Sequence, residues 1–582
     1  MKKYIYYVAC VMLLGGCKDV LDKPDLNAIN PALWNNEATA TQYLNRLYDR
    51  SMPTQGFGGN SNLSDEAPSV TNETPNSADT MYGRLGIDAV GNYSLATYQR
   101  IRDINIAIED VDKGTLSPEV KARIKGQAQV MRAWEYWELV RLYGGVPMVL
   151  TAFDPFMDDM QTPRHTTSQA IDIIIADLDE AIAGLPAQWG SSERGRVTRG
   201  AAAALKARIL LYWASPQFNP TDEAQRWQRA YTASKEAKEL VDQDGKGLHN
   251  NFGTMFLVEG QQNKEAVFVR LYDFNTGKTH TWDNSARPRL IGVDGGQSSN
   301  PTKQLVDAFP MKNGLPITDP ASGYDPVYYW KDRDPRFYST IVYNGAEYEV
   351  QGFPAGRKQW QYYYHNDGSL RSVEPTAPTT TGFYTRKAVD PNIAQTLVKQ
   401  SGTDWIEIRY AEVLMNLAEA ANEIGQINEA YSLLSAIRER AGIEAGDGLY
   451  GLKAGMSKEE MRDAIMQERQ VEFAFENKRY WDLRRRNLFE EDLNGTRRLG
   501  IRTVLKPEFD HDDFLEIRDN IDLDTEFDTY FTIEEWLLDE ESAINYPQPQ
   551  YNFFAIPSNI LDRSPAVEQT MGWGSGSFDP LQ

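Results

Sequence analysis

Residues 406–442 read IEIRYAEVLMNLAEAANEIGQINEAYSLLSAIRERAG, and this stretch decides the fold. In its first half, apolar or small residues recur every three or four positions, which is the spacing of one face of an α-helix. That face comprises Ile408, Ala411, Leu414, Ala418 and Ala421. Gly425 interrupts the pattern, and a second face follows with Ile427, Ala430, Leu434 and Ile437. The stretch therefore predicts two consecutive helices joined by a tight turn.

The small side chains on these two faces allow the helices to pack closely against each other. The length of the pair is near the period of about 34 residues of a tetratricopeptide repeat, which the pair resembles. A generic helical hairpin is the alternative interpretation. Further helical periodicity covers residues 37–50, 98–111, 119–143, 167–185, 199–214 and 227–241. We therefore expect a mainly α protein in which tetratricopeptide-like helix pairs form a scaffold over about 36–243 and 403–490.

The character of the sequence changes between residues 245 and 400, where Gly, Pro, Asn and Tyr dominate and helical periodicity is lost. So long an irregular stretch is uncommon inside a compact protein and is usually functional. Binding residues are often carried on loops that a rigid scaffold positions, so we expect this loop-rich region to hold the ligand. A second, acidic stretch at about 505–545 is expected to form a solvated insertion.

The N-terminus has the features of an exported lipoprotein. Two lysines precede residues 4–14, which carry no charge and are too short to cross a bilayer core of about 30 Å. The run LGGC at 14–17 resembles a bacterial lipobox. We expect residues 1–16 to be a signal peptide, Cys17 to be acylated, and residues 17–35 to form a lipidated tether. An ordinary signal peptide with a chance cysteine is the alternative.

Charge and cysteine content narrow the classes of function. Cys10 lies in the predicted signal peptide, so the mature chain would keep Cys17 as its single cysteine and form no internal disulfide. The full chain has 60 basic and 83 acidic residues and a formal net charge of −23. A chain this acidic repels nucleic acid, so we expect no nucleic-acid partner.

Segments spread along the whole chain carry a resemblance to a known family. They are AQVMRAWEYWELVRLYGGVPMVL at 128–150, TRGAAAALKARILLYWAS at 198–215, NPTKQLVDAFPMKNG at 300–314, DPRFYSTIVYNG at 334–345, the helix pair at 408–442, ERQVEFAFENKRYWDLRR at 468–485 and the tail at 556–573. In this order, the set resembles the SusD/RagB family of nutrient-binding outer-membrane lipoproteins.

The resemblance implies a single α-rich, SusD-like domain, here about 36–582, anchored by lipid to the outer membrane and facing the cell exterior. It also implies a partner, a SusC-like TonB-dependent transporter. The substrates of the family are usually glycans, although one branch serves peptides. The resemblance supplies no motif for the residues that contact the ligand.

Glycan binding requires flat apolar faces for the C–H surface of a sugar and polar groups for its hydroxyls, which aromatic residues beside polar ones provide. The loop-rich region supplies such rings, and an early loop adds one more. The candidate ligand-binding residues are Trp282, Asp283, Asn284, Tyr328, Tyr329, Trp330, Trp360, Tyr362, Tyr363 and Tyr82. Core packing is the alternative for each ring taken singly, and we expect at least one to form the binding platform.

Motifs for catalysis are weak. The histidines are scattered without a His-x-x-x-His zinc pair, and no Gly-x-Ser-x-Gly elbow is present. Glu468, Glu472 and Glu476 recur every four residues, but Arg469 and Arg479 lie within ion-pair reach, which favours a structural charge network.

These observations together predict a non-catalytic protein, without metal or cofactor, that binds glycan at the cell surface and delivers it to the transporter. Capture of peptide or glycopeptide on the same scaffold is the alternative. A surface glycoside hydrolase is a more remote one.

Overall fold

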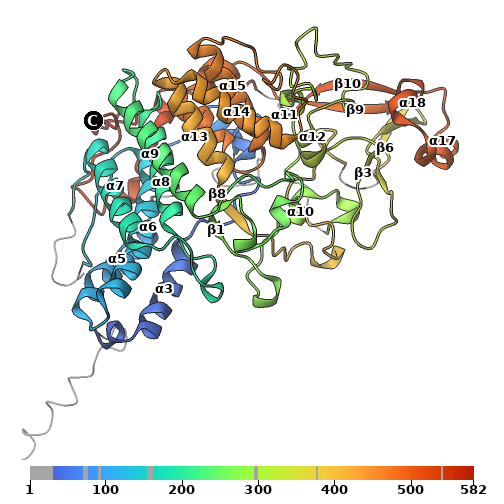
Figure 1. The fold of residues 1–582 in the computed structure, drawn as a ribbon. Helices are drawn as coiled ribbons and strands as arrows, with labels where there is room; N and C mark the ends of the chain where they lie inside the picture. Colours follow the sequence, from blue (N-terminus) through green and yellow to red (C-terminus); the bar gives the residue numbers. More distant parts are fainter. Residues whose placement is uncertain are drawn as a thin grey trace, which may run out of the picture.

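The computed structural model describes residues 31–69, 77–89, 93–153, 161–293, 299–374, 376, 378–538 and 542–582. The predicted signal peptide, Cys17 and most of the predicted tether lie outside these residues. Figure 1 shows the long helices gathered on one side of the molecule, with short strands and long loops on the other.

The helical scaffold forms from two separate parts of the sequence. Its N-terminal helices are α3 Glu37–Ser51, α4 Ser77–Met81, α5 Leu95–Asp110, α6 Pro118–Tyr143, α7 Thr167–Gly184, α8 Arg199–Ala214 and α9 Ala224–Gln243. Its C-terminal helices are α13 Tyr410–Glu423, α14 Ile427–Ala441, α15 Lys458–Glu472 and α16 Arg479–Arg485, and α19 Ser558–Leu561 follows near the C-terminus. Helices α6 and α7, α8 and α9, and α13 and α14 pack as pairs, and α13 also packs against α9. The predicted mainly α class is therefore confirmed.

Local sequence signals explain where several helices begin and end. Thr166 and Gln169 form a capping box at the start of α7, and Ser457 and Glu460 form one at the start of α15. Each box satisfies backbone N–H groups that the start of a helix leaves free. Gly442 ends α14 with φ 87°, a left-handed conformation that glycine adopts without strain.

The predicted helix pair is present as α13 and α14, but its first residues belong to a strand. Ile408 lies in β8 Trp405–Arg409, which pairs antiparallel with β1 Ala266–Arg270. All five residues of β8 are buried. The apolar residues that recur every three or four positions therefore did not show whether this segment is a strand or a helix. The strand pair ties the loop-rich region to the start of α13.

The loop-rich region consists of short elements around a second hydrophobic core. Its helices and two-stranded pairs are α10 Trp282–Ala286, α11 Lys303–Ala308, α12 Pro335–Thr340, β2 Ile341–Val342 with β7 Tyr384–Thr385, and β3 Ala346–Glu347 with β4 Lys358–Gln359. A four-stranded sheet has the order β10 Phe531–Leu537, β9 Leu499–Leu505, β5 Tyr363–Asn366 and β6 Ser369–Ser372. Strands β9 and β10 pair antiparallel along their full length, and they reach away from the scaffold, as Figure 1 shows.

The acidic stretch between β9 and β10 is folded onto this second core. It forms α17 His511–Ile517 and α18 Leu523–Tyr530, where the expectation was a solvated insertion. Phe514, Phe527 and Phe531 are at most 2% exposed and pack in the second core. These residues form an apolar face that holds the segment on the core. In the sequence, the many carboxylates around them make this face hard to recognise.

A buried network of ion pairs joins the scaffold to the loop-rich region. Glu468, Glu472 and Glu476 are at most 1% exposed. Glu472 pairs with Arg336 and Arg409, each at 2.7 Å. The three carboxylates therefore form a structural charge network, as predicted.

The partners predicted for this network are wrong. Arg469 pairs with Asp482 at 2.8 Å, and Arg479 pairs with Asp65 at 2.8 Å. The spacing in the sequence allowed ion pairs within one helix. In the folded protein, cations from more distant segments lie beside the glutamates instead. A buried carboxylate is stabilised by whichever cation the packing places beside it.

Candidate functional site

The three candidate tryptophans of the loop-rich region are core residues. Trp282, Trp330 and Trp360 are 2%, 2% and 6% exposed. The ring of Trp282 stacks on Phe57 with 5.5 Å between centroids, and that of Trp330 stacks on Tyr343 at 5.3 Å. The structure thus corrects the expectation that these rings present a face to a sugar, because other side chains of the second core cover them.

Two of the candidate tyrosines are buried in the same way. Tyr329 is 5% exposed, and Tyr362 is 0% exposed. The ring of Tyr362 lies 5.4 Å from that of Phe531, and Tyr329 lies 6.0 Å from Phe383. Tyr362 is therefore a core residue, whereas Tyr329 also borders a groove described below.

The polar neighbours of Trp282 hold the backbone around α10. Asp283 is fully buried and accepts a hydrogen bond from the backbone N–H of Asp390 at 2.8 Å. Burial raises the pKa of Asp283 to about 6. Asn284 accepts a hydrogen bond from the backbone N–H of Val293 at 2.8 Å. Since both side chains are buried and used within the protein, they are not available to a ligand.

The remaining candidate rings are partly exposed and stay candidates. Tyr328 donates a hydrogen bond from its hydroxyl to Asp528 at 2.9 Å. On β5, the ring of Tyr363 lies 5.6 Å from the guanidinium of Arg502. Tyr82 follows α4 and contacts the guanidinium of Arg84 at 4.9 Å. These three rings come from separate segments, and Tyr328 lies in the sequence between Val327 and Tyr329, which line a groove.

The groove beside Tyr328 is a cavity of about 580 Å³ that we call the β9–β10 groove. One wall is the loop at 317–329, and the other is formed by β9 and β10 together with α11 and α18. Its apolar lining consists of Val306, Ile317, Tyr324, Pro326, Val327, Tyr329, Phe383, Ile501, Phe527, Phe531 and Ile533. An apolar cavity of this size with few polar groups is typical of a small-molecule site.

Charged side chains form the polar part of the β9–β10 groove. Lys303 lies between Asp307 and Glu535 and pairs with both. Lys506 donates a hydrogen bond to the backbone carbonyl of Asp528 at 2.6 Å. Burial raises the pKa of Asp307, although Lys303 opposes this shift. The groove therefore offers donors and acceptors around aromatic and aliphatic walls, which is the combination that a sugar requires.

A candidate residue predicted from the sequence lies on one wall of the groove, and none lies on the other wall. Tyr324 and Val327 precede the predicted aromatic run, and Val327 is 40% exposed. Phe527 and Ile533 lie in the acidic stretch that was expected to be solvated. The signal that could have revealed them is the set of apolar residues spaced among its carboxylates, which indicates a buried face.

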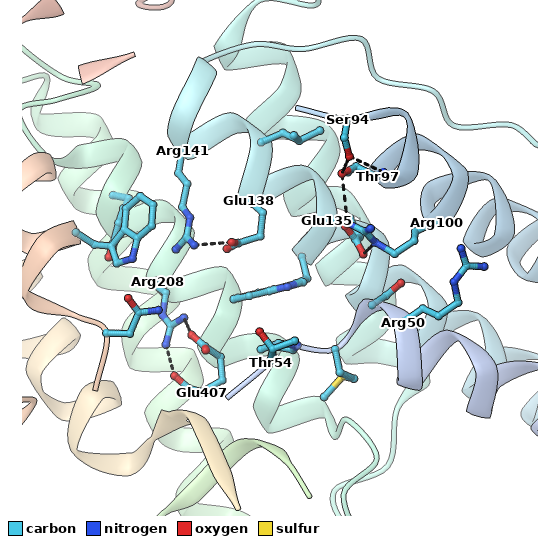
Figure 2. A pocket seen from close by; sticks show the side chains of 18 of the residues that line it. Arg50, Thr54, Ser94, Thr97, Arg100, Glu135, Glu138, Arg141, Arg208 and Glu407 are labelled. Atoms are coloured by element: carbon cyan, nitrogen blue, oxygen red, sulfur yellow. Dashed lines mark hydrogen bonds and ion pairs between the residues drawn. The ribbon is translucent and has the colours of Figure 1, made fainter. Parts of the chain in front are cut away.

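A second concave site lies on the helical scaffold and is shown in Figure 2. This scaffold cleft has a volume of about 460 Å³ and is lined by the end of α3, the residues after it, α5, α6, α8, β8 and the start of α16. Figure 2 shows the pairs Arg100–Glu135, Arg141–Glu138 and Arg208–Glu407 around one space.

The scaffold cleft differs from the β9–β10 groove because charged side chains dominate its lining. Arg100 and Glu135 form two hydrogen bonds, at 2.6 and 2.8 Å. Burial raises the pKa of Glu138, and the neighbouring Arg141 opposes this shift. The guanidinium of Arg141 also lies 3.6 Å from the ring centre of Trp481. Nothing in the sequence patterns indicated this cleft, because its residues come from six elements.

Comparison with known proteins places this architecture in a family. A family profile described as "SusD family" matches residues 264–573, which is more than half of the chain. A second profile, described as "Starch-binding associating with outer membrane", matches residues 21–211. The chain belongs to the SusD family, a family of carbohydrate-binding proteins associated with the outer membrane.

Individual relatives agree with this assignment. A SusD-like protein of Formosa agariphila is 24% identical over 82% of this chain and 89% of its own length. The crystal structure of a SusD-like protein from Bacteroides fragilis is 25% identical and superposes with a TM-score of 0.73 over 94% of this chain and 99% of that one. A laminarin-binding SusD-like protein shares the fold at 18% identity, with a TM-score of 0.62 over 93% of this chain and all of that one.

Among the residues that the structure describes, each helix is too short or too polar to cross a membrane.

Proposed function

We propose that this protein captures glycan at the bacterial surface and passes it, without cleaving it, to a SusC-like TonB-dependent transporter. Membership of a carbohydrate-binding family supports the ligand class. The single observation that carries the proposal is the β9–β10 groove, whose apolar walls and polar edge suit a saccharide. We also propose that acylated Cys17 anchors the protein in the outer membrane with its bulk facing outward.

Within the groove, Tyr324 is the residue on which the proposal can be tested most sharply. Its ring is partly exposed and lies on the wall opposite β10. Tyr231 on α9 is a matched control, because it is a partly exposed tyrosine outside the groove whose hydroxyl bonds Glu429 at 2.8 Å. Both changes remove one ring of the same size.

The experiment is affinity electrophoresis of the full chain in native gels that contain soluble starch, laminarin or other neutral polysaccharides. We expect the wild type and Tyr231→Ala to be retarded in at least one gel and Tyr324→Ala to lose most of that retardation. A lost sugar-stacking contact weakens binding by about tenfold, which native gels resolve. Equal retardation of the two variants would remove the groove from the binding site.

Ionic strength separates the glycan from the peptide alternative. Binding of a neutral glycan should change little as salt rises, whereas a cationic peptide held by acidic side chains should dissociate. Retardation by no polysaccharide, together with salt-sensitive binding of a basic peptide, would overturn the proposal. The transporter is tested separately by co-purification from detergent-solubilised outer membranes, which Cys17→Ala should reduce because the protein would no longer be anchored.

A further inference from the structure

We propose that the scaffold cleft of Figure 2 is a second saccharide-binding site, specific for a short neutral saccharide. The inference rests on the proposed function, since it assumes that glycan is the ligand of this chain. It concerns a different part of the molecule from the β9–β10 groove, because no residue lines both.

The cations lining the cleft are already neutralised, which favours a neutral ligand. Each of the five has a carboxylate partner: Arg50 has Asp103, Arg100 has Glu135, Arg141 has Glu138, and Arg208 and Lys478 share Glu407 and Glu412. A charged ligand would have to compete with one of these pairs at a cost in desolvation. A ligand that carries only hydroxyls can bond to the paired groups without separating them.

Charged side chains of α6 form a row along the cleft. Glu135, Glu138 and Arg141 recur every three residues, so they lie along one side of the helix. Figure 2 shows Glu135 and Glu138 beside the same space, together with their arginine partners. A carboxylate accepts from adjacent hydroxyls and a guanidinium donates to them, so a row of such pairs can bond several hydroxyls of a sugar.

Several side chains that line the cleft keep unused hydrogen-bonding capacity. Among the described residues, Ser51 Oγ, Glu138 Oε1, Arg141 Nε and Trp481 Nε1 have no hydrogen-bond partner although all four atoms are buried. Oε2 of Glu138 pairs with Arg141, so Oε1 is an acceptor left over on a side chain that is 28% exposed. The mixture of donors and an acceptor matches hydroxyl groups, which do both.

Part of the cleft lining is apolar. Trp134, Leu139 and Met52 border the cleft beside the ion pairs. Trp134 is 8% exposed, so these three side chains add a limited apolar surface beside the charged groups. Apolar contact beside convergent polar groups, in a cavity of this size, is the usual composition of a saccharide or cofactor site.

Thr54 provides a way to close the cleft without disturbing the core. It is exposed, follows α3 and lies beside the cleft in Figure 2. Thr54→Trp should fill the opening, whereas Thr54→Val changes only the hydroxyl and serves as the matched control. Glu138→Gln is an independent variant, because it keeps the shape of the side chain and removes the carboxylate charge.

The test is calorimetric titration of the full chain with maltose, laminaribiose, cellobiose, xylobiose and mannobiose, and with glycine as a zwitterionic probe. We expect at least one disaccharide to bind, Thr54→Trp and Glu138→Gln to weaken it by about tenfold or more, and Thr54→Val and Tyr231→Ala to leave it within about twofold. Circular dichroism confirms that each variant is folded.

Several results would overturn the inference while leaving the proposed function intact. In one, gels retain the protein on polysaccharide but no disaccharide binds in the titration. In another, Tyr324→Ala removes disaccharide binding and Thr54→Trp does not. In a third, glycine binds and no sugar does. Failure of both the polysaccharide gels and the titrations would refute the proposed function itself. The two failures are therefore distinguishable.

Discussion

Replacing Arg409 with methionine tests how the two halves of the fold are held together. Arg409 ends β8 and donates five hydrogen bonds of 2.7–3.0 Å to Glu265, Glu472 and Glu476. Its side chain is 1% exposed, so bulk solvent does not reach these bonds. Methionine keeps the length and apolar stem of the side chain.

The expected loss is about 3–5 kcal/mol in the free energy of unfolding, which is the usual cost of removing one partner from a buried ion pair. Adding five charged hydrogen bonds at about 1.5–3 kcal/mol each would predict much more. The sum overestimates the effect because the carboxylates keep other cations: Glu265 keeps Arg440, Glu472 keeps Arg336 and Arg440, and Glu476 keeps Lys387.

The effect should also depend on pH with a definite sign. Burial opposes ionisation of Glu472, but Arg440, Arg409 and Arg336 together hold its pKa well below the ordinary value. A carboxyl with a lowered pKa in the folded state stabilises the protein above its unfolded pKa of about 4.3, and this contribution is lost as pH falls. The difference between wild type and Arg409→Met should therefore be largest near pH 7 and should shrink below about pH 4.

Urea unfolding followed by far-ultraviolet circular dichroism measures the loss as a shift of the midpoint at constant slope. Arg229→Met is the control, because Arg229 pairs with Asp172 at 3.1 Å while both side chains are largely exposed, at 41% and 65%. It should cost no more than about 1 kcal/mol. A loss for Arg409→Met as small as that of the control would refute the reasoning about the buried network.

Two further predictions concern residues in the second core. Trp330→Ala should cost about 3–5 kcal/mol of stability in urea unfolding, because it removes a ring that is 2% exposed. Trp330→Phe should cost less. Unchanged stability together with lost glycan binding would instead show that Trp330 belongs to the ligand site. Burial raises the pKa of Glu66 to about 8, with Asp65 adding to the shift. Wild-type stability should therefore fall relative to Glu66→Gln as pH rises from about 5 to 8, by about 1 kcal/mol per pH unit, and parallel pH profiles of the two proteins would contradict this.

The helix pairs were predictable because each carries its evidence locally. The spacing of Ala411, Leu414 and Ala418 and the break at Gly425 indicate α13 and α14 without knowledge of any distant residue. Ile408 was misassigned because an apolar residue fits a buried strand as well as a helical face. Local periodicity does not distinguish the two over so short a run.

The ligand site was harder to predict because loop aromatics are covered by residues far away in the sequence. Trp330 is packed against Phe527, with ring centres 4.8 Å apart, and Trp360 donates a hydrogen bond to Asp519 at 2.6 Å. Both partners lie in the acidic stretch, whose charge suggested solvent. A tryptophan among polar residues therefore has the same sequence signature whether its ring is open or buried, and only the long-range fold decides between them.

If both the β9–β10 groove and the scaffold cleft hold sugar units, their separation has a consequence for capture and release. The groove is built on β9, β10 and α18, and the cleft is built on α3, α5, α6 and α8, which Figure 1 shows on opposite sides of the molecule. A polysaccharide long enough to reach both would bind more tightly than either site allows, because the second contact becomes intramolecular. A fragment too short to span them would be held by one site alone and would dissociate faster. Such a protein would retain long chains and release short ones.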